Sequence, residues 1–403
     1  MIYHAYQAQA DATEPLRLMA WAAAEYLGHP SIFGRFWPRN LGAGWEALSR
    51  AGLTHKRPPF GIESVLVGNR QVELREVPVR RTPFCTLLHF QKEMPAPQPR
   101  VLLVAPMSGH FATLLRDTVR TLLPEHDVYL TDWHNVRDVP LRHGPFGFDD
   151  FVDHLIGFLE AIGPGAHLLA ICQPCVAALA AVAIMAQDGH AAQPCSMTLM
   201  AGPIDTRISP TKVNELATSH PLSWFEHKLI GVVPCRYPGA FRRVYPGFLQ
   251  LTAFMSMNAE RHMKAFHDLY NNRVKGNHAA VEAIRKFYDE YFAVMDLTAD
   301  FYLETVRDVF QEHTLPRGLM TWRGRRVEPR AIRKTALLTV EGERDDICAI
   351  GQTLAAQDLC SGLRPYMKQH HMQTGVGHYG VFSGRRWSGQ IYPVVRELIQ
   401  VSQ

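Results

Sequence analysis

The pattern that most constrains the fold is an alternation of strands and helices that stops and later resumes. Between residues 101 and 200, short apolar runs of strand length alternate with longer stretches of helical periodicity. Such alternation is typical of a parallel sheet that carries helices on both faces. The expected strands are 101–104, 127–131, 167–171 and 196–200, and the expected helices are 110–123, 148–162 and 174–186.

The alternation is interrupted by a long segment of a different kind. Residues 210–333 show helical patterns only and are rich in aromatic side chains. Alternation then resumes with a strand at 336–340, a helix at 347–359, a strand at 365–369 and a last helix at 387–401. A mostly parallel sheet that is interrupted by helices and then completed predicts an α/β-hydrolase core with a helical cap or lid insertion.

The segment before this series has its own pattern. Helical periodicity covers residues 13–50 and includes aromatic-rich turns around Phe33, Phe36, Trp37 and Trp45. Apolar residues alternate with polar ones between 63 and 91, which predicts antiparallel strands. We therefore expect three parts: an N-terminal helical segment (1–62), an α/β-hydrolase catalytic core (63–209 and 334–403) and a helical cap (210–333).

Composition narrows the classes of partner. The 42 basic and 38 acidic side chains give a net charge of +4, and no Lys/Arg run could follow phosphates, so we expect no nucleic-acid partner. The start lacks the basic and apolar regions of a signal peptide. The most apolar segment, 167–186, contains Gln173 and Pro174 and reads as buried core, so we expect no membrane span. Seven scattered cysteines fit a reducing compartment and predict a cytoplasmic protein.

The central motif is His-Leu-Leu-Ala-Ile-Cys-Gln-Pro-Cys at 167–175, followed by an Ala-rich helix. A sharp turn from strand to helix lifts its side chain above the sheet edge, and the positive helix end favours a thiolate there. Ala170 and Pro174 are the small residues on either side, where Gly is usual, and Pro is tolerated in a first helical turn. The motif predicts Cys172 as a nucleophile.

Two other interpretations of the motif stay open. A buried structural cysteine is one of them, because most cysteines pack as small apolar residues. The other is a thiol–disulfide oxidoreductase site formed by Cys172 and Cys175, because redox pairs of this spacing also stand at a strand-to-helix turn. A single Cys-x-x-Cys without a second pair does not predict a zinc site.

An acid and a base follow in the resumed series. Asp345 lies in the loop after the strand at 336–340, although either Asp345 or Asp346 could instead cap the next helix. His378 lies in the Gly-rich loop Gly-Val-Gly-His-Tyr-Gly before the last helix. The order Cys, Asp, His along the chain is the order of the triad in α/β-hydrolases, which predicts that His378 is the base and Asp345 its partner.

Further residues are expected around this triad. The backbone N–H groups of Gln173 and of Met107 or Ser108 would form the oxyanion hole, unless the loop at 105–110 is a plain turn with Ser108 as a helix cap. Trp133 and His134 follow the carboxyl end of a strand, where sites form in open α/β sheets. With Tyr379, next to the base, they are the expected substrate contacts.

Five motifs together resemble the intracellular polyhydroxyalkanoate (polyhydroxybutyrate) depolymerases, which degrade stored polyester granules in bacteria. They are Val-Ala-Pro-Met-Ser-Gly-His at 104–110, Tyr-Leu-Thr-Asp-Trp at 129–133, Ile-Cys-Gln-Pro at 171–174, Arg-Asp-Asp-Ile at 344–347 and Gly-His-Tyr-Gly at 377–380. The resemblance covers nearly the whole chain. It implies a Cys172–His378–Asp345 triad, a thioester intermediate, no cofactor or metal, and a granule-associated protein. The partner would be the amorphous polyester surface, and a homo-oligomer is left open.

The polyhydroxyalkanoate synthases are similar in mechanism. They share the cysteine elbow, the Asp-x-Ile context and the Gly-His loop, but they usually carry Gly two residues after the cysteine, where this chain has Pro174. The departure favours a depolymerase. Because both reactions pass through a thioester, the sequence leaves open whether the acyl group goes to water or to a growing chain.

Overall fold

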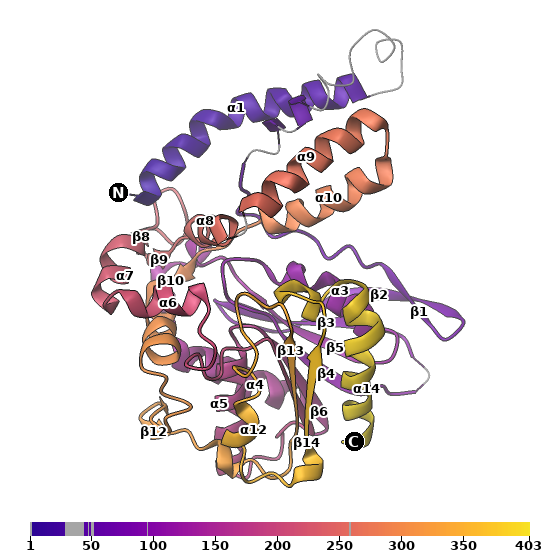
Figure 1. Ribbon diagram of the computed structural model, residues 1–403, viewed down its shortest axis with the longest axis vertical. Coiled ribbons are helices and arrows are strands. Elements are labelled where there is room, and N and C mark those ends of the chain that lie inside the picture. Colours follow the sequence, from indigo (N-terminus) through magenta and orange to yellow (C-terminus); the bar gives the residue numbers. More distant parts are fainter. Residues whose placement is uncertain (1, 29–43, 47, 50–51, 95, 258) are drawn as a thin grey trace.

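The computed structural model describes the chain in six stretches. They are residues 2–28, 44–46, 48–49, 52–94, 96–257 and 259–403. A twisted sheet runs through the main body, with helices on both faces (Figure 1). The helices α1 (Ile2–Gly28), α9 (Ala259–Lys275) and α10 (His278–Tyr291) lie together at the top of the view, away from the sheet. The predicted aromatic turn at Phe33, Phe36 and Trp37 falls outside the described residues.

The main sheet has nine strands in the order β1-β2-β3-β5-β4-β6-β7-β13-β14. The series from β5 to β14 is parallel, whereas β1, β2 and β3 are antiparallel and β3 pairs antiparallel with β5. This topology confirms the predicted α/β-hydrolase fold. The strands are β1 (Ser64–Val67), β2 (Arg70–Arg81), β3 (Cys85–Lys92), β4 (Arg100–Val104), β5 (Asp127–Trp133), β6 (Ala166–Ile171), β7 (Ser196–Met200), β13 (Ala336–Gly342) and β14 (Lys368–Gln373).

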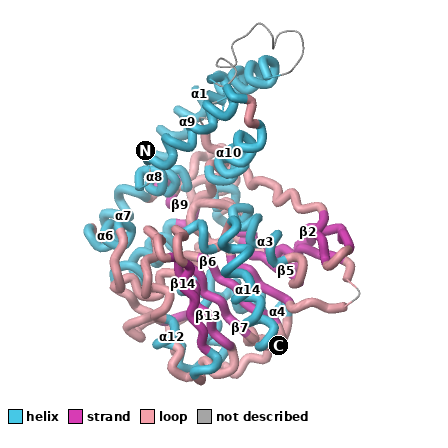
Figure 2. Tube along the Cα trace, turned by 45° about the vertical axis from the view of Figure 1, so that its right-hand side comes forward, coloured by secondary structure: helices cyan, strands magenta, loops and turns pink. Residues whose placement is uncertain are grey.

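Helices cover both faces of the parallel strands. In Figure 2, α14 (Tyr392–Val401) lies along β13 and β7. On the opposite face α4 (Phe148–Ile162) packs against α5 (Cys175–Gln187). Every residue of β6 and β7 is buried, as is α5 from Cys175 to Met185, because the helices shield both faces. The remaining core helices are α3 (Arg116–Leu122), α12 (Ala356–Leu359) and α13 (Gly384–Arg386).

Two predicted elements of the resumed series differ from the structure. The strand expected at 365–369 begins only at Lys368, since Pro365 starts a 3₁₀ turn instead of donating to a ladder. The helix expected at 347–359 is mostly turns. There the buried carboxylate of Glu341 accepts backbone N–H groups of Gly351, Thr353 and Leu354, and only α12 is helical.

The segment between β7 and β13 rises over the carboxyl ends of the parallel strands (Figure 1). The sequence predicted only helices here, and this was wrong in part, because the segment also contains a small three-stranded sheet and a two-stranded hairpin. These strands are two or three residues long, too short for an alternating pattern to show in the sequence. Its elements besides α9 and α10 are α6 (Lys212–Ser219), α7 (Leu222–Leu229), β8 (Gly231–Val232), β9 (Arg243–Tyr245), α8 (Gly247–Met257), β10 (Leu297–Thr298), α11 (Ala299–Thr305), β11 (Thr321–Trp322) and β12 (Arg325–Arg326).

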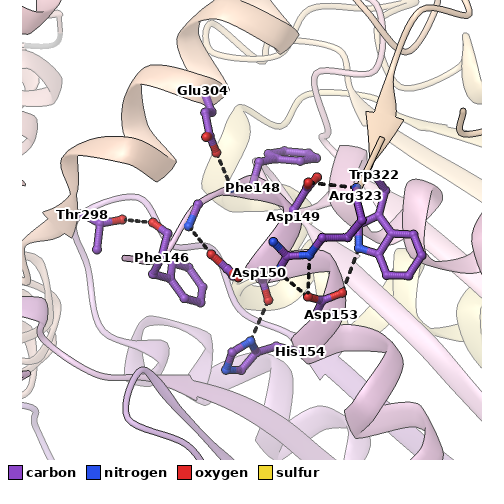
Figure 3. Close-up of polar contacts among 11 residues, drawn as sticks. Phe146, Phe148, Asp149, Asp150, Asp153, His154, Thr298, Glu304, Trp322 and Arg323 are labelled. Carbon is purple, nitrogen blue, oxygen red and sulfur yellow. Dashed lines mark hydrogen bonds and ion pairs between the residues drawn. The ribbon is translucent and has the colours of Figure 1, made fainter. Parts of the chain in front are cut away.

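Polar contacts fasten the returning end of this segment to the first turn of α4 (Figure 3). Arg323, in the β11–β12 turn, forms ion pairs of 2.5 Å with Asp150 and 2.6 Å with Asp153. Glu304 of α11 accepts the backbone N–H of Phe148 at 2.5 Å. Acidic groups at a helix N-terminus are favourable, and here they also hold the cation of the hairpin. The segment is therefore joined to the core at more than its two chain connections.

Helix α1 is fixed to the same segment. The hydroxyl of Tyr3 donates to the buried carboxylate of Asp296 at 2.5 Å. The ring of Tyr6 stacks on Phe248 of α8, with ring centroids 3.9 Å apart. These contacts place the start of the chain against residues more than 200 positions away in sequence.

Candidate active site

Cys172 occupies a strained turn between β6 and α5. Its φ is +67°, in the left-handed region that is unfavourable for a residue with a Cβ. The strand-to-helix connection holds it there, because its N–H donates to the carbonyl of Met200 (2.8 Å) and its carbonyl accepts the N–H of Cys175 (3.1 Å). Backbone strain of this kind lifts a side chain out of the sheet edge, as the sequence predicts for Cys172.

The turn needs a glycine in the loop just after the neighbouring strand β7. A Cβ at Gly202 would stand 2.2 Å from the Cβ of Cys175 and 2.4 Å from its Sγ. Thr353 fixes this glycine, since its hydroxyl accepts the N–H of Gly202 and donates to its carbonyl. The end of β7 can therefore pass close behind the cysteine turn.

His378 and Asp345 meet at the same edge of the sheet. His378 Nδ1 lies 2.8 Å from Asp345 Oδ2, and both side chains are buried. The other carboxylate oxygen accepts the N–H groups of Ile347 and Cys348, each at 2.9 Å. Asp345 thus orients the histidine and also closes the turn that follows. The sequence had left open which of Asp345 and Asp346 would cap the next element.

Opposing effects act on the protonation of His378. Burial disfavours the charged imidazole, but the charges of Asp345 and Cys172 and hydrogen bonds with both raise the pKa of His378 well above its ordinary value. With Nδ1 directed at Asp345, the other ring nitrogen is available to the thiol. The structure thus brings the three predicted triad residues into contact.

The predicted oxyanion residues border the same cavity as Cys172. Met107 and Ser108 follow β4, and Gln173 follows the cysteine. Within the described residues, the backbone N–H groups of these three have no hydrogen-bond acceptor. The loop that contains Met107 and Ser108 is bonded to the segment between β7 and β13, because the carbonyl of Gly109 accepts the N–H of Met295 at 2.9 Å. Ser108 makes no helix cap, because η1 (Ala112–Leu115) begins four residues later behind Phe111.

A cavity of about 370 Å³ opens above Cys172. Its floor comes from the core, and its walls come mainly from α6, α7, α8, α11 and the residues that follow α11. The walls are largely apolar, as is usual for sites that bind apolar ligands. The aromatic side chains among the lining residues are Phe225, Tyr245, Phe254, Phe301, Tyr302 and Phe310.

The residues expected to contact substrate lie elsewhere. Trp133 and His134 border a separate pocket, which Cys172 does not line. The Trp133 indole donates to the carbonyl of Ala105, and the His134 ring bonds the hydroxyl of Thr86. Tyr379 does not line the cavity above Cys172, and its ring lies near Phe287 and Tyr291 of α10. The position of a residue at the end of a strand predicts that it lies at the edge of the sheet, but not which cavity at that edge it lines.

Sequence reasoning missed other residues of the cavity, notably Lys212, Gln250 and Thr305. No motif marks them, since they come from separate helices that only the fold assembles. The aromatic richness of 210–333 was a usable signal. Phe225, Tyr245, Phe254, Phe301 and Tyr302 line the cavity, whereas others, such as Tyr288, pack between helices.

Cys175 points away from this cavity. It is fully buried, and its Sγ lies 3.3 Å from the carbonyl oxygen of Ala170. Burial, together with the nearby Cys172, raises the pKa of its thiol well above the ordinary value. All seven cysteines are free. This environment suits packing behind the turn and speaks against Cys175 as a partner in thiol–disulfide exchange.

In the described stretches, no group of three or more His, Cys, Asp or Glu side chains is arranged to hold a metal ion. None of the helices described is both long and apolar enough to cross a bilayer.

The sheet order and the strained turn define the fold as that of an α/β-hydrolase, and the family match that follows makes the class an ester hydrolase. A family model described as the C-terminus of PHB depolymerase matches residues 201–403. The chain belongs to this family of polyhydroxybutyrate depolymerases. The matched part contains Asp345 and His378 and begins after Cys172.

Solved structures with a similar course of the chain include three hydrolases. A meta-cleavage product hydrolase from Pseudomonas fluorescens IP01 has 15% identity, 84% of this chain and 98% of that chain covered, and a TM-score of 0.42. A 2-hydroxy-6-oxo-6-phenylhexa-2,4-dienoate hydrolase from Rhodococcus sp. strain RHA1 has 13% identity, coverages of 82% and 99%, and a TM-score of 0.43. A thermophilic esterase from Thermogutta terrifontis has 13% identity, 82% of this chain and 99% of that chain covered, and a TM-score of 0.42. A comparison with curated protein sequences finds no match.

Proposed function

We propose that the protein is a polyhydroxybutyrate depolymerase that cleaves its polyester through a thioester on Cys172. The observation that carries the proposal is the convergence of Cys172, His378 and Asp345 at the base of an apolar cavity. Family membership supports the polyester as substrate, and with it association with storage granules in the cytoplasm. The division into an N-terminal segment, a catalytic core and a cap is part of the same proposal.

The first step follows from the geometry. His378 takes the proton of Cys172 while Asp345 holds the imidazole and stabilises its charged form. The thiolate sulfur attacks the carbonyl carbon of a 3-hydroxybutyrate ester, and the N–H groups of Gln173 and the Met107–Ser108 loop receive the oxyanion. The bond from carbon to the leaving oxygen breaks, and His378 returns the proton to that oxygen, which departs as an alcohol.

The second step regenerates the thiol. His378 accepts a proton from water, and the hydroxide attacks the thioester carbonyl. The carbon–sulfur bond breaks, Cys172 leaves as thiolate and recovers its proton from His378. The products are 3-hydroxybutyrate or short oligomers. No step requires a cofactor or a metal.

The direct test replaces the nucleophile. The Cys172→Ala variant should release no 3-hydroxybutyrate from amorphous granules, whereas Cys235→Ala, at an exposed and distant thiol, should retain full release. Circular dichroism spectra of the two variants should agree, which would show that both proteins are folded. Retained release by the Cys172→Ala variant would contradict the proposal.

A second assay separates the two directions of the thioester chemistry. The unaltered protein is supplied with 3-hydroxybutyryl-CoA in place of granules. Pro174, with a φ of −67°, fits the turn after the cysteine and is the residue by which this chain departs from the synthases. We expect no polymer. Polymer formation would assign the protein to the synthases instead.

A further inference from the structure

The cavity above Cys172 contains polar groups without partners. The Nε2 and Oε1 atoms of Gln173 and the hydroxyl of Thr305 are buried and have no hydrogen-bond partner among the described residues. Lys212 is the single charged side chain among the residues that line the cavity, and it forms no ion pair with any residue described. It is exposed and therefore stands at the mouth.

Some other polar groups that line the cavity have partners within the protein. Tyr245 and Tyr302 hydrogen-bond to each other, and Ser256 donates to the carbonyl of Ala253. A buried polar group without a partner costs about 1–3 kcal/mol, and native proteins rarely leave one unsatisfied. Gln173 and Thr305 can therefore offer hydrogen bonds to a ligand that enters the cavity.

The chemistry of the groups indicates the ligand. The amide of Gln173, the hydroxyl of Thr305 and the ammonium of Lys212 can all donate hydrogen bonds. A polyester offers acceptors at every ester carbonyl, and its methyl groups suit the apolar walls. It has one anionic group, the carboxylate at one end of the chain. Lys212 is the first residue of α6, so the positive end of the helix dipole and the ammonium group of Lys212 both attract an anion.

We propose that Lys212 binds the terminal carboxylate of the polyester, so that the enzyme removes units from the carboxyl end. This inference rests on the proposed depolymerase function. The thiolate of Cys172 bonds to the ester carbonyl carbon, and the carbon–oxygen bond on the side of the carboxyl end breaks. The leaving alkoxide takes its proton from His378 and departs as the hydroxy acid whose carboxylate Lys212 holds. The rest of the chain stays on the sulfur as the thioester.

The test compares two trimers of 3-hydroxybutyrate that differ at one end, the free acid and its methyl ester. The unaltered enzyme should cleave the acid with a kcat/KM about tenfold higher, the size expected for one charge-assisted contact at a cavity mouth. The preference should weaken in high salt, because exposed charges are screened. Lys212→Met should raise KM for the acid about tenfold, leave the methyl ester unchanged and so abolish the preference. Lys212→Arg should retain it.

Lys228→Met is the matched control, since Lys228 is an exposed lysine on α7 that does not line the cavity. It should keep the preference for the acid. Equal cleavage of both trimers by the unaltered enzyme, or equal losses on both in Lys212→Met, would overturn the carboxylate proposal alone. Failure of the unaltered enzyme to cleave either trimer or granules would overturn the depolymerase function and this inference with it.

Discussion

Asp345 serves two structural purposes at once. One carboxylate oxygen faces His378, and the other accepts two backbone N–H groups of the following turn. An asparagine can keep an oxygen on the backbone groups, but it carries no charge to stabilise a protonated imidazole. The loop and the chemistry can therefore be separated by one substitution.

Asp345→Asn should lower kcat for a soluble ester such as p-nitrophenyl butyrate by about a thousandfold or more, as loss of the triad carboxylate does elsewhere. The melting temperature should change little. Asp346→Asn, at the exposed neighbouring position, is the control and should retain activity. Comparable losses in the two variants would contradict the assignment of Asp345.

The charge state of His378 predicts a pH effect on stability. Its pKa is raised in the folded protein, against burial, by Asp345 and Cys172. Protonation is then stronger in the folded than in the unfolded chain, so the stabilisation is fully present below the unfolded pKa of about 6.5 and is lost as pH rises through the folded value. The difference in unfolding free energy between the unaltered protein and His378→Gln should therefore shrink as pH rises. A difference that grows with pH would contradict the prediction.

At the scale of elements, the site depends on how closely the loop that follows β7 passes behind α5. Gly202→Ala places a methyl group within 2.4 Å of both Cβ and Sγ of Cys175, on a fully buried helix that cannot move aside. We expect a loss of about 1–3 kcal/mol in unfolding free energy, as for overpacked cores, and a lower kcat because the cysteine turn must shift. Gly389→Ala, where the added methyl meets nothing within 4 Å, should affect neither quantity.

Elements also show where sequence patterns suffice. Strand β7 was predicted at its observed residues, since a run of buried apolar residues has one interpretation between two helices. The helix expected after β13 was wrong for most of its length. Local propensity favoured a helix, but the buried carboxylate of Glu341, ten or more residues earlier, claims the backbone N–H groups that a helix would use.

At the scale of the whole molecule, the start of the chain is tied to the segment above the site. Tyr3→Phe removes the hydroxyl that bonds Asp296, a carboxylate with no exposed surface whose pKa burial raises to about 6. The loss should be about 1–3 kcal/mol, as for other buried groups left short of a partner. Hydrogen exchange in Tyr3→Phe, compared with the unaltered protein, should become faster in α1 and stay unchanged in the main sheet. Tyr366→Phe, at an exposed tyrosine, should leave exchange unchanged.

The sequence by itself determined the fold class, the alternation of strands and helices along the chain and the identity of the three residues that meet at the site. Each of these depends on patterns within a single strand, helix or turn, or on the order of such units along the chain. It also singled out the loops at 105–110 and 172–173, because they follow predicted strands. The family resemblance supplied the substrate class, which the family comparison supports.

Only the tertiary structure decided what surrounds the triad. Lys212, Gln173 and Thr305 come from separate elements and line one cavity when the segment 210–333 folds over the sheet. Only the structure shows that Trp133 and His134 line another pocket and that Cys175 lies in the core. Strand and helix periods report which residues face inward, but long-range packing alone sets which inward faces leave a cavity between them.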